Sequence, residues 1–394
     1  MDMWKVFQVK RCWEARLRMA IGGSSDIFQG MDDISGIIGE VPRLPRVELE
    51  LSDWRDGLIV RVPNWLGDAC MAFPALSVLR RLLPVECGLF VVCPPSLGAL
   101  FESLAGVDAV VALSGAHKAW SSRDFRAVSK LNAGVGLLLN NSLRDAIHFR
   151  MSRVPRLYGM AARGRSIFLT RAFRVPKKGK GGVGGTRHAA RYLALAEALG
   201  APSWDGVPPH VSSAKEKEIL AVGVSAALAA PRLLAVAPGA AYGPSKRWPA
   251  AKFNDICRRW VDSGGTVAVL GAPGEEGAAS ETARGLPGDS VFDFSGKTDL
   301  GDVVEILRSA TAVVANDSGI MHLSAVLGGR GVAVFGSTDP GATPPVSEKW
   351  RLLSAGLDCS PCFERRCPSG GYACLEAITP DMVWEALDSI LKED

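Results

Sequence analysis

Short apolar segments alternate with helical patterns along most of this chain, and this alternation limits the folds open to it. In the first half, apolar runs such as LIVRV (58–62) and CGLFVVC (87–93) flank a helical pattern, ACMAFPALSVLRRLLP (69–84). Strands that alternate with helices indicate βαβ units and a parallel sheet. Because the strands are apolar throughout, we expect helices on both faces of the sheet. The chain is therefore predicted to be an α/β protein.

The same alternation begins again in the second half. It runs from the strand RLLAVAPG (232–239) to a final helical pattern, TPDMVWEALDSILKED (379–394), and a Pro-, Ser- and Ala-rich stretch at 201–230 separates the two series. We predict two doubly wound, Rossmann-like domains, at 56–205 and 206–394, because 394 residues exceed one ordinary core. Such sheets bind ligands beyond the carboxyl ends of their strands. The predicted site is therefore a cleft where the two domains face each other.

Residues 1–55 precede this pattern and are predicted to be an N-terminal extension. Loose helical spacing up to Met19 is followed by the breaking sequence GGSSDIFQG (22–30). Three interpretations stay open for this extension. It is a basic amphipathic helix resting on a membrane surface, a weakly ordered tail, or the product of a start codon assigned too far upstream.

The charge distribution and the apolar runs exclude several classes of protein. The formal charge of +4 is a mild excess, with Lys and Arg interleaved with Asp and Glu, so a nucleic-acid partner is not indicated. No apolar run reaches the ~18 residues that a membrane span needs. The N-terminus lacks the continuous apolar core of a signal peptide. We therefore expect no transmembrane segment and a cytoplasmic protein.

The chain has nine cysteines, and they fall into two groups. Five are isolated in the sequence, which favours a reducing compartment: Cys12, Cys70, Cys87, Cys93 and Cys257. The other four lie together in CSPCFERRCPSGGYAC: Cys359, Cys362, Cys367 and Cys374. A CxxC pair followed by two more cysteines suggests zinc, but the short and uneven gaps fit one or two disulfides or free thiols as well. None is expected to be catalytic.

The first candidate binding stretch is APGAAYGPSKRWPAAKF (237–253). A strand ends there, and a loop follows that carries Ser245, Lys246 and Arg247 before a helix opens near Pro249. A basic side chain at the carboxyl end of a strand suits a phosphate group. The alternative is an ordinary solvated loop in which Trp248 is a packing anchor.

The second stretch, VVANDSGIMHLSAVLG (313–328), places Asp317 and Ser318 between a strand and a helix. The free N–H groups of a helix start favour a pyrophosphate, and Gly319 lets a ligand approach closely. His322 lies one turn into this helix. The alternative is that Asp317 or Ser318 only caps the helix and that His322 is a packing residue.

A third stretch, LGAPGEE (270–276), again ends a strand in a Gly/Pro turn. Glu275 is predicted to accept hydrogen bonds from ribose hydroxyls, as acidic groups do in dinucleotide-binding folds. The alternative is that Glu275 and Glu276 complement the dipole of the following helix.

Three motifs in order along the chain resemble glycosyltransferase family 9, the ADP-heptose:lipopolysaccharide heptosyltransferases. They are WLGDACMAFPALSVLRRLLP (65–84), PGAAYGPSKRWP (238–249) and NDSGIMHLSAVLG (316–328). Two further segments, 137–159 and GSTDPGATPP (336–345), are similar to heptosyltransferase II in particular. The resemblance covers roughly residues 57–392.

The resemblance implies a GT-B fold whose first domain binds the acceptor and whose second domain binds the nucleotide-sugar. It implies that Asp68 is the catalytic base, with an N-cap of a helix beginning at Ala69 as the structural alternative. Lys246 is expected to stabilise the departing ADP, so that no metal or other cofactor is required. The predicted donor-binding residues are Ser245, Lys246, Trp248, Glu275, Asp317, Ser318, Gly319 and His322.

The implied reaction moves heptose, with inversion, from ADP-L-glycero-D-manno-heptose to the inner core of lipopolysaccharide that already bears one heptose. This anionic acceptor places the protein at the inner face of the inner membrane. The predicted acceptor-binding residues are Asn141, Arg144, Lys177, Lys178, Arg187 and His188, with Lys180, Arg163 and Arg165 as additions. The basic loop is expected to act as a lid or, alternatively, to be a solvated loop. Two other functions stay open: a family 9 transferase with another sugar or acceptor, and a non-catalytic nucleotide- or sugar-binding module.

Overall fold

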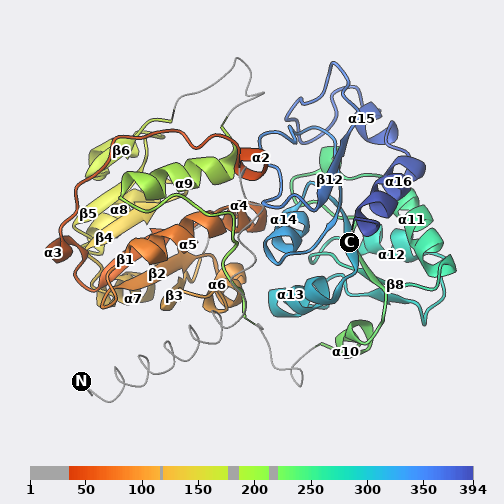
Figure 1. The fold of residues 1–394 in the computed structure, drawn as a ribbon, viewed down its shortest axis with the longest axis horizontal. Coiled ribbons are helices and arrows are strands. Elements are labelled where there is room, and N and C mark those ends of the chain that lie inside the picture. Colours follow the sequence, from red (N-terminus) through yellow and green to blue (C-terminus); the bar gives the residue numbers. More distant parts are fainter. Residues whose placement is uncertain (1–34, 116–118, 176–185, 213–220, 394) are drawn as a thin grey trace. The chain divides into compact units, whose positions relative to one another are not determined.

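The computed structural model describes residues 35–115, 119–175, 186–212 and 221–393. Two parallel six-stranded sheets, each with helices on its faces, form the fold and confirm the predicted α/β class (Figure 1). The chain from residue 35 onward, with both sheets, forms one compact unit. The boundary predicted between residues 205 and 206 falls in the segment that connects the two sheets, and it stays a prediction.

The first sheet has the strand order β3-β2-β1-β4-β5-β6, and every neighbouring pair is parallel. The order reverses between β1 and β4, which makes the space beyond their carboxyl ends the expected ligand position. The strands are β1 (Gly57–Arg61), β2 (Gly88–Cys93), β3 (Ala109–Ala112), β4 (Val135–Leu138), β5 (Arg156–Met160) and β6 (Arg171–Phe173).

The second sheet has the order β12-β11-β10-β7-β8-β9, which repeats the topology of the first. Its reversal point lies between β7 and β10, which pair in parallel. The second predicted ligand position is therefore beyond the ends of these two strands. The strands are β7 (Leu233–Ala237), β8 (Thr266–Val269), β9 (Val291–Asp293), β10 (Ala312–Asn316), β11 (Gly331–Phe335) and β12 (Trp350–Ser354).

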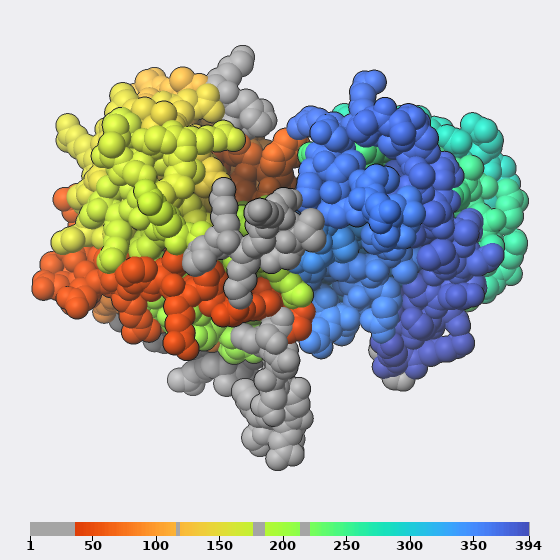
Figure 2. Space-filling view, turned by 90° about the horizontal axis from the view of Figure 1, so that it is seen from above, coloured from red at the N-terminus to blue at the C-terminus, as the bar shows by residue number. Residues whose placement is uncertain are grey.

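Helices connect most consecutive strands, as parallel pairing requires, but no α-helix lies among the described residues between β5 and β6 or between β11 and β12. The early segment and the first half contain α2 (Ser35–Ile38), α3 (Leu51–Trp54), α4 (Leu66–Met71), α5 (Phe73–Leu82), α6 (Gly98–Glu102), α7 (Ser122–Lys130), α8 (Leu143–Met151) and α9 (His188–Ala198). The second half contains α10 (Val224–Leu228), α11 (Ala250–Asp262), α12 (Glu276–Ala283), α13 (Leu300–Ser309), α14 (Gly319–Val326), α15 (Ala373–Glu376) and α16 (Pro380–Leu391). Short 3₁₀ turns lie at η1 (Pro95–Leu97), η2 (Arg165–Phe168) and η4 (Pro244–Lys246). Figure 2 shows the two halves as separate colour blocks, red to yellow-green for the first and cyan to blue for the second.

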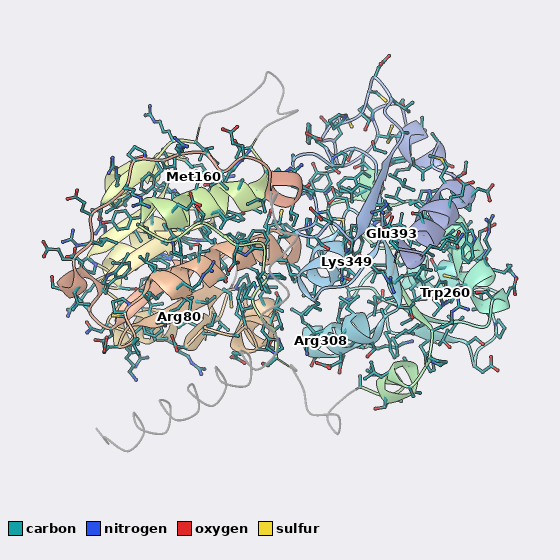
Figure 3. All side chains as sticks on the ribbon, viewed as in Figure 1. Arg80, Met160, Trp260, Arg308, Lys349 and Glu393 are labelled. Carbon is teal, nitrogen blue, oxygen red and sulfur yellow. The ribbon has the colours of Figure 1, made fainter. Side chains whose placement is uncertain are left out.

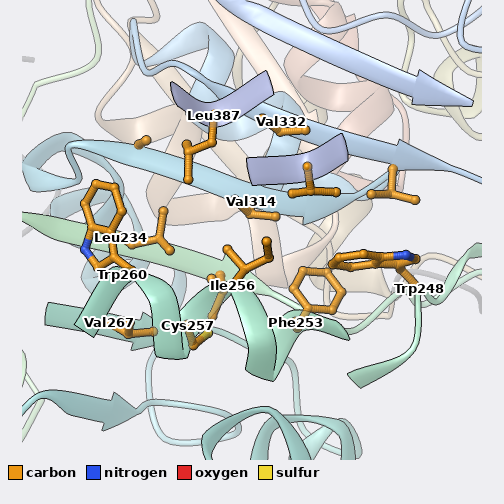
Figure 4. Packing of buried hydrophobic residues seen from close by; sticks show 14 of the residues in the cluster. Leu234, Trp248, Phe253, Ile256, Cys257, Trp260, Val267, Val314, Val332 and Leu387 are labelled. Carbon is orange, nitrogen blue, oxygen red and sulfur yellow. The ribbon is translucent and has the colours of Figure 1, made fainter. Parts of the chain in front are cut away.

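The core of the second half lies between its sheet and the helices α11 and α16 (Figure 4). Strand residues such as Val314 and Val332 pack against Phe253 and Trp260 of α11 and against Leu387 of α16, and all five are at most 1% exposed. Burial of a side chain of this size contributes about 1.5–3 kcal/mol. Packing on this scale holds the loops beyond the strand ends in place.

Polar contacts tie the layers together at their edges. Arg80 of α5 donates to the Cys87 carbonyl at 2.9 Å and pairs with Asp108, just before β3, at 3.0 Å (Figure 3). Arg232 lies over the ring of Trp260, with 4.7 Å between the guanidinium carbon and the ring centroid. The ion pair between Arg80 and Asp108 is partly exposed and adds little free energy by itself.

Part of the predicted N-terminal extension packs against the first half. Ile38 and Trp54 are buried, at 1% and 4% exposed, and the Val47 N–H donates to the Ala198 carbonyl at the end of α9 at 2.7 Å. Residues 35–55 are therefore part of the folded structure, although Gly36 of α2 lies beside Glu348 of the second half. Residues 1–34 lie outside the described residues. Within the part of the chain that the structure describes, every helix is too short or too polar to cross a bilayer.

Candidate active site

Asp68 lies beyond the carboxyl end of β1, at the reversal point of the first sheet. Helix α4 begins at Leu66 after the N-cap residue Trp65, so Asp68 is the third helical residue. The alternative that Asp68 caps a helix starting at Ala69 is therefore wrong. Its side chain is 30% exposed, which leaves the carboxylate accessible to a substrate. A carboxylate in the first turn is also favoured by the helix dipole.

A buried arginine fixes the loop that leads to Asp68. Arg61, the last residue of β1, is 1% exposed and pairs with Asp145 of α8 at 2.9 Å. Its guanidinium also donates to the Asn64 side chain at 2.6 Å, and Asn64 lies just before α4. Burial lowers the pKa of Arg61, while the Asp145 carboxylate opposes this. The strand end, α8 and the loop before the base are thus held together by one side chain.

His188 contacts Asp68 directly, with 3.0 Å between Nδ1 and Oδ1. An ionised carboxylate only accepts hydrogen bonds, so the Nδ1–H of His188 is the donor. His188 is the first residue of α9, and its own N–H donates to the Ala342 carbonyl at 3.3 Å. The sequence analysis placed His188 in the acceptor site and missed this pair. The two residues are 120 positions apart, and no local pattern connects them.

At the reversal point of the second sheet, Lys246 forms a buried ion pair with Asp317, with 2.6 Å between Nζ and Oδ2. The two side chains are 14% and 4% exposed. The Thr338 hydroxyl donates to the same Asp317 oxygen at 2.6 Å. Lys246 also lies 5.0 Å from the ring centroid of Tyr242. Asp317 therefore positions the ammonium group of Lys246 beyond the ends of β7 and β10.

Two predicted donor-binding side chains are part of the protein interior instead. Trp248 is 1% exposed, and its indole N–H donates to the Ile378 carbonyl at 2.9 Å. Ser245 is 2% exposed and donates to the Glu364 carbonyl. Asn316, fully buried, accepts from the Trp248 N–H and donates to the Pro238 carbonyl, at 2.9 and 2.8 Å. The prediction that the Trp248 and Ser245 side chains bind the nucleotide is corrected: they position the loop that carries Lys246.

The start of α14 packs directly against α4. A Cβ on Gly319 would lie 2.9 Å from the Cβ of Leu66, and a Cβ on Gly67 would lie 2.7 Å from His322 Cδ2. Both glycines permit this approach, because real Cβ atoms do not come closer than 3.0 Å. The prediction that Gly319 makes room for a ligand is therefore corrected, since Leu66 occupies the space beside it.

His322 is 4% exposed, and burial lowers its pKa to about 4, although the Asp317 and Asp68 carboxylates oppose this shift. The imidazole is therefore neutral at neutral pH. Its Nδ1 has no hydrogen-bond partner among the described residues, and the same holds for the hydroxyl of Ser318, the N-cap residue of α14. Both polar atoms lie beside the Lys246–Asp317 pair, in the segment that leads from β10 into α14.

Glu275 lies beyond the end of β8, at the start of α12. Its carboxylate accepts from the Ala272 N–H at 2.9 Å. A Cβ on Gly239, just after β7, would lie 2.2 Å from Glu275 Cδ, so only glycine fits beneath this carboxylate. The Glu275 carboxylate thus lies beside the end of β7. That it binds the ribose hydroxyls stays a prediction. Glu276 caps the Gly274 N–H, and such backbone contacts lower its pKa.

The predicted acceptor-binding residues are scattered. Asn141 and Arg144 are exposed around the start of α8, and Arg163 is exposed after β5. Arg187 instead donates to the Gly36 carbonyl at 2.6 Å, which corrects its assignment to the acceptor. Arg165 is fully buried, donates to the Met160 carbonyl at 2.8 Å, and has a pKa lowered by burial to about 10. Lys177, Lys178 and Lys180 lie outside the described residues.

The eight cysteines that the structure describes are free thiols, and Cys12 lies outside the described residues. Within the described ranges, no group of three His, Cys, Asp or Glu side chains is arranged to hold a metal ion. Of the three alternatives for the segment 359–374, the structure shows free thiols. Cys367 has a pKa lowered to about 7, mainly by its contact with the Ser369 hydroxyl at 3.1 Å.

Two doubly wound sheets of the same topology, with a carboxylate at one reversal point and a paired lysine at the other, give the architecture of the GT-B fold. The solved structure of E. coli ADP-heptose LPS heptosyltransferase II superimposes with a TM-score of 0.66 at 22% identity, covering 85% of this chain and 98% of that one. E. coli heptosyltransferase WaaC with ADP-2-deoxy-2-fluoro heptose gives a TM-score of 0.59 at 19% identity, covering 84% and 99%.

The chain belongs to glycosyltransferase family 9 (heptosyltransferase), whose family model matches residues 122–373. It is 28% identical over 352 residues to lipooligosaccharide heptosyltransferase 2 of Haemophilus influenzae, which covers 85% of this chain and 99% of that protein. The chain is therefore an enzyme, a glycosyltransferase, as the sequence motifs predicted.

Proposed function

We propose that this enzyme transfers heptose from ADP-heptose to the inner core of lipopolysaccharide, with the first heptose of the core as acceptor. The observation that carries the proposal is the pairing of two sites. One site is the carboxylate of Asp68, which His188 positions, and the other is the ammonium group of Lys246, which Asp317 positions. The packing of α4 on α14 brings the two sites together. The Haemophilus relative, named a type 2 heptosyltransferase, supports the choice of acceptor.

The second half supplies the binding site for the donor in this proposal. Lys246 and the free N–H groups at the start of α14 provide positive potential for the pyrophosphate. Glu275 accepts hydrogen bonds from the ribose hydroxyls. Because Lys246 is held by Asp317 before the reaction, its charge needs no rearrangement when negative charge develops on the departing ADP.

The first half supplies the base. As the acceptor hydroxyl oxygen forms its bond to the anomeric carbon, the bond from that carbon to the phosphate oxygen breaks, and ADP leaves with the electron pair. The hydroxyl proton passes to Asp68. Attack on the face opposite the leaving group inverts the anomeric configuration. His188 keeps one carboxylate oxygen of Asp68 fixed, so the other oxygen is directed to the substrate.

The first half also carries the proposed contacts with the acceptor. Asn141 and Arg144 are exposed beyond the end of β4, at the same edge of the first sheet as Asp68. An anionic core with carboxylates and phosphates fits arginine, and we propose the lysines at 177, 178 and 180 as further contacts.

Thermal stability against ADP, UDP, GDP and CMP tests the donor first. A ligand at 100 times its dissociation constant stabilises by about 2.7 kcal/mol, so ADP is expected to raise Tm and the others not. Transfer from ADP-heptose is then measured on two lipopolysaccharides, one without heptose and one with a single heptose. Turnover on the second supports the proposal. A Tm shift with UDP or GDP instead of ADP would support a glycosyltransferase but would contradict ADP-heptose as the donor.

Replacing His188 by alanine is expected to lower kcat by about 10- to 100-fold, because a base displaced by about 1 Å loses this much. The affinity for ADP is expected to stay unchanged. His188→Asn, whose amide N–H replaces the Nδ1–H donor, should recover part of kcat. His210, exposed and remote from Asp68, provides the control variant His210→Ala. Equal kcat in His188→Ala and wild type would exclude His188 as a positioning residue.

A further inference from the structure

Asp339 is a buried carboxylate with one unsatisfied oxygen. It lies in the loop after β11 and is 9% exposed. Oδ1 accepts a hydrogen bond from the Gly341 N–H at 2.8 Å. Oδ2 is fully buried and has no hydrogen-bond partner among the residues that the structure describes. The motif GSTDPGATPP contributed to the family resemblance, but Asp339 was not among the predicted site residues.

A buried carboxylate oxygen without a donor is costly, because the group has lost its contacts with water and gained none in return. Most buried polar groups in proteins are satisfied, so an exception needs a reason. The Gly341 contact accounts for Oδ1 only, as a local turn. The turn needs one acceptor oxygen, so it does not explain why a second oxygen, Oδ2, is buried without a donor.

Two residues of the same loop, Thr338 and Ala342, connect it to the Lys246–Asp317 pair and to the Asp68–His188 pair. Thr338, immediately before it, donates to Asp317, which holds Lys246. Ala342, three residues after it, accepts the N–H of His188, whose ring holds Asp68. The loop therefore runs between the cation proposed for the pyrophosphate and the base proposed for the acceptor. In the reaction, the transferred sugar must lie between these two groups.

We propose that Asp339 Oδ2 accepts a hydrogen bond from a hydroxyl group of the sugar on the nucleotide donor. The inference rests on the proposed function and names the group that selects the sugar. A carboxylate repels phosphates. Two described cations lie near this loop, and both have partners: Lys246 pairs with Asp317, and Arg187, which lines a pocket with Pro340 and Gly341, donates to the Gly36 carbonyl. A sugar hydroxyl is the neutral donor that the reaction itself brings to this position. Gly341, whose N–H contacts the other oxygen of Asp339, is exposed, so the loop reaches the protein surface beside this carboxylate.

The test compares affinities for ADP, ADP-heptose and ADP-glucose by calorimetry in the full chain. Asp339→Asn keeps an oxygen for the Gly341 turn but replaces Oδ2 by an amide, and Asp339→Ala removes both oxygens. In both variants we expect ADP-heptose to bind about 10- to 100-fold more weakly and ADP to bind as in wild type. Asp293→Asn is the matched control, because Asp293 accepts from the N–H two residues ahead in the same way, at the end of β9.

The outcomes separate this inference from the proposed function. If wild type transfers heptose and Asp339→Asn keeps its preference for ADP-heptose over ADP, only the role of Asp339 is overturned. If Asp339→Asn behaves as wild type and Asp339→Ala weakens ADP and ADP-heptose equally, Asp339 only shapes the turn. If wild type prefers ADP-glucose and both variants lose that preference, the role of Asp339 stands and heptose is discarded. Wild type that binds neither sugar nucleotide better than ADP overturns both.

Discussion

Replacement of Asp68 by asparagine is expected to lower kcat for sugar transfer by about 10²- to 10⁴-fold, the usual contribution of a general base. Asparagine has nearly the same shape, and its side-chain oxygen still accepts from the Nδ1–H of His188. The variant therefore keeps the local geometry and loses the proton acceptor. The affinity for ADP is expected to stay within about twofold of wild type, because in the proposed reaction Asp68 acts on the acceptor hydroxyl and does not contact ADP.

The measurement is single-turnover transfer from ADP-heptose, together with the affinity for ADP by calorimetry. Asp56→Asn is the control, because Asp56 is exposed at the other end of β1 and has no part in the proposed reaction. Substantial activity in Asp68→Asn would show that another group takes the proton. A large loss of ADP affinity would place Asp68 in the donor site instead.

Replacement of Lys246 by methionine is expected to weaken ADP binding by about tenfold or more, since one hydrogen bond to a charged group contributes about 1.5–3 kcal/mol. The rate of transfer should fall as well, because the charge that stabilises the departing ADP is gone. The variant also leaves Asp317 buried, with the Thr338 hydroxyl as its remaining side-chain partner among the described residues. Removing one partner of a buried ion pair costs about 3–5 kcal/mol, so Tm should fall too.

A double variant separates these two effects. Lys246→Met with Asp317→Asn removes both charges, and it should recover much of the lost stability without recovering ADP affinity. Lys252→Met is the single-site control, since Lys252 pairs with Glu376 at 3.0 Å on α11, outside the proposed site. If the double variant binds ADP as wild type does, Lys246 stabilises the loop and does not bind phosphate.

Local patterns in the sequence predicted the fold class, which the structure confirms, and the loops proposed to bind ligands. The strand LIVRV and the helical pattern after it became β1, α4 and α5, with the helical segment divided at Ala72. Hydrophobic periodicity depends on neighbours a few residues away, so it can be read without the tertiary structure. The Gly- and Pro-rich turns likewise marked the loops beyond β7 and β8.

The same patterns failed where a residue type can either bind a ligand or pack inside the protein. Trp248 and Ser245 stand beside Lys246 in the sequence, yet their side chains turn into the protein while Lys246 reaches Asp317. Arg187 and His188 are adjacent, yet one contacts Gly36 and the other contacts Asp68. Adjacent side chains point in different directions, and the distant segments that pack there decide which partner each one meets.

The sequence by itself determined the order of strands and helices along the chain and the residue types in the loops after the strands, whereas the order of strands within each sheet came from the tertiary structure. Only the tertiary structure decided that His188 holds Asp68, that Asp317 holds Lys246, and that Gly67 and Gly319 let α4 and α14 touch. These contacts join segments tens to hundreds of residues apart. Their geometry follows from the packing of whole layers, because burial of the apolar faces brings distant loops together and leaves each polar group to find a partner there.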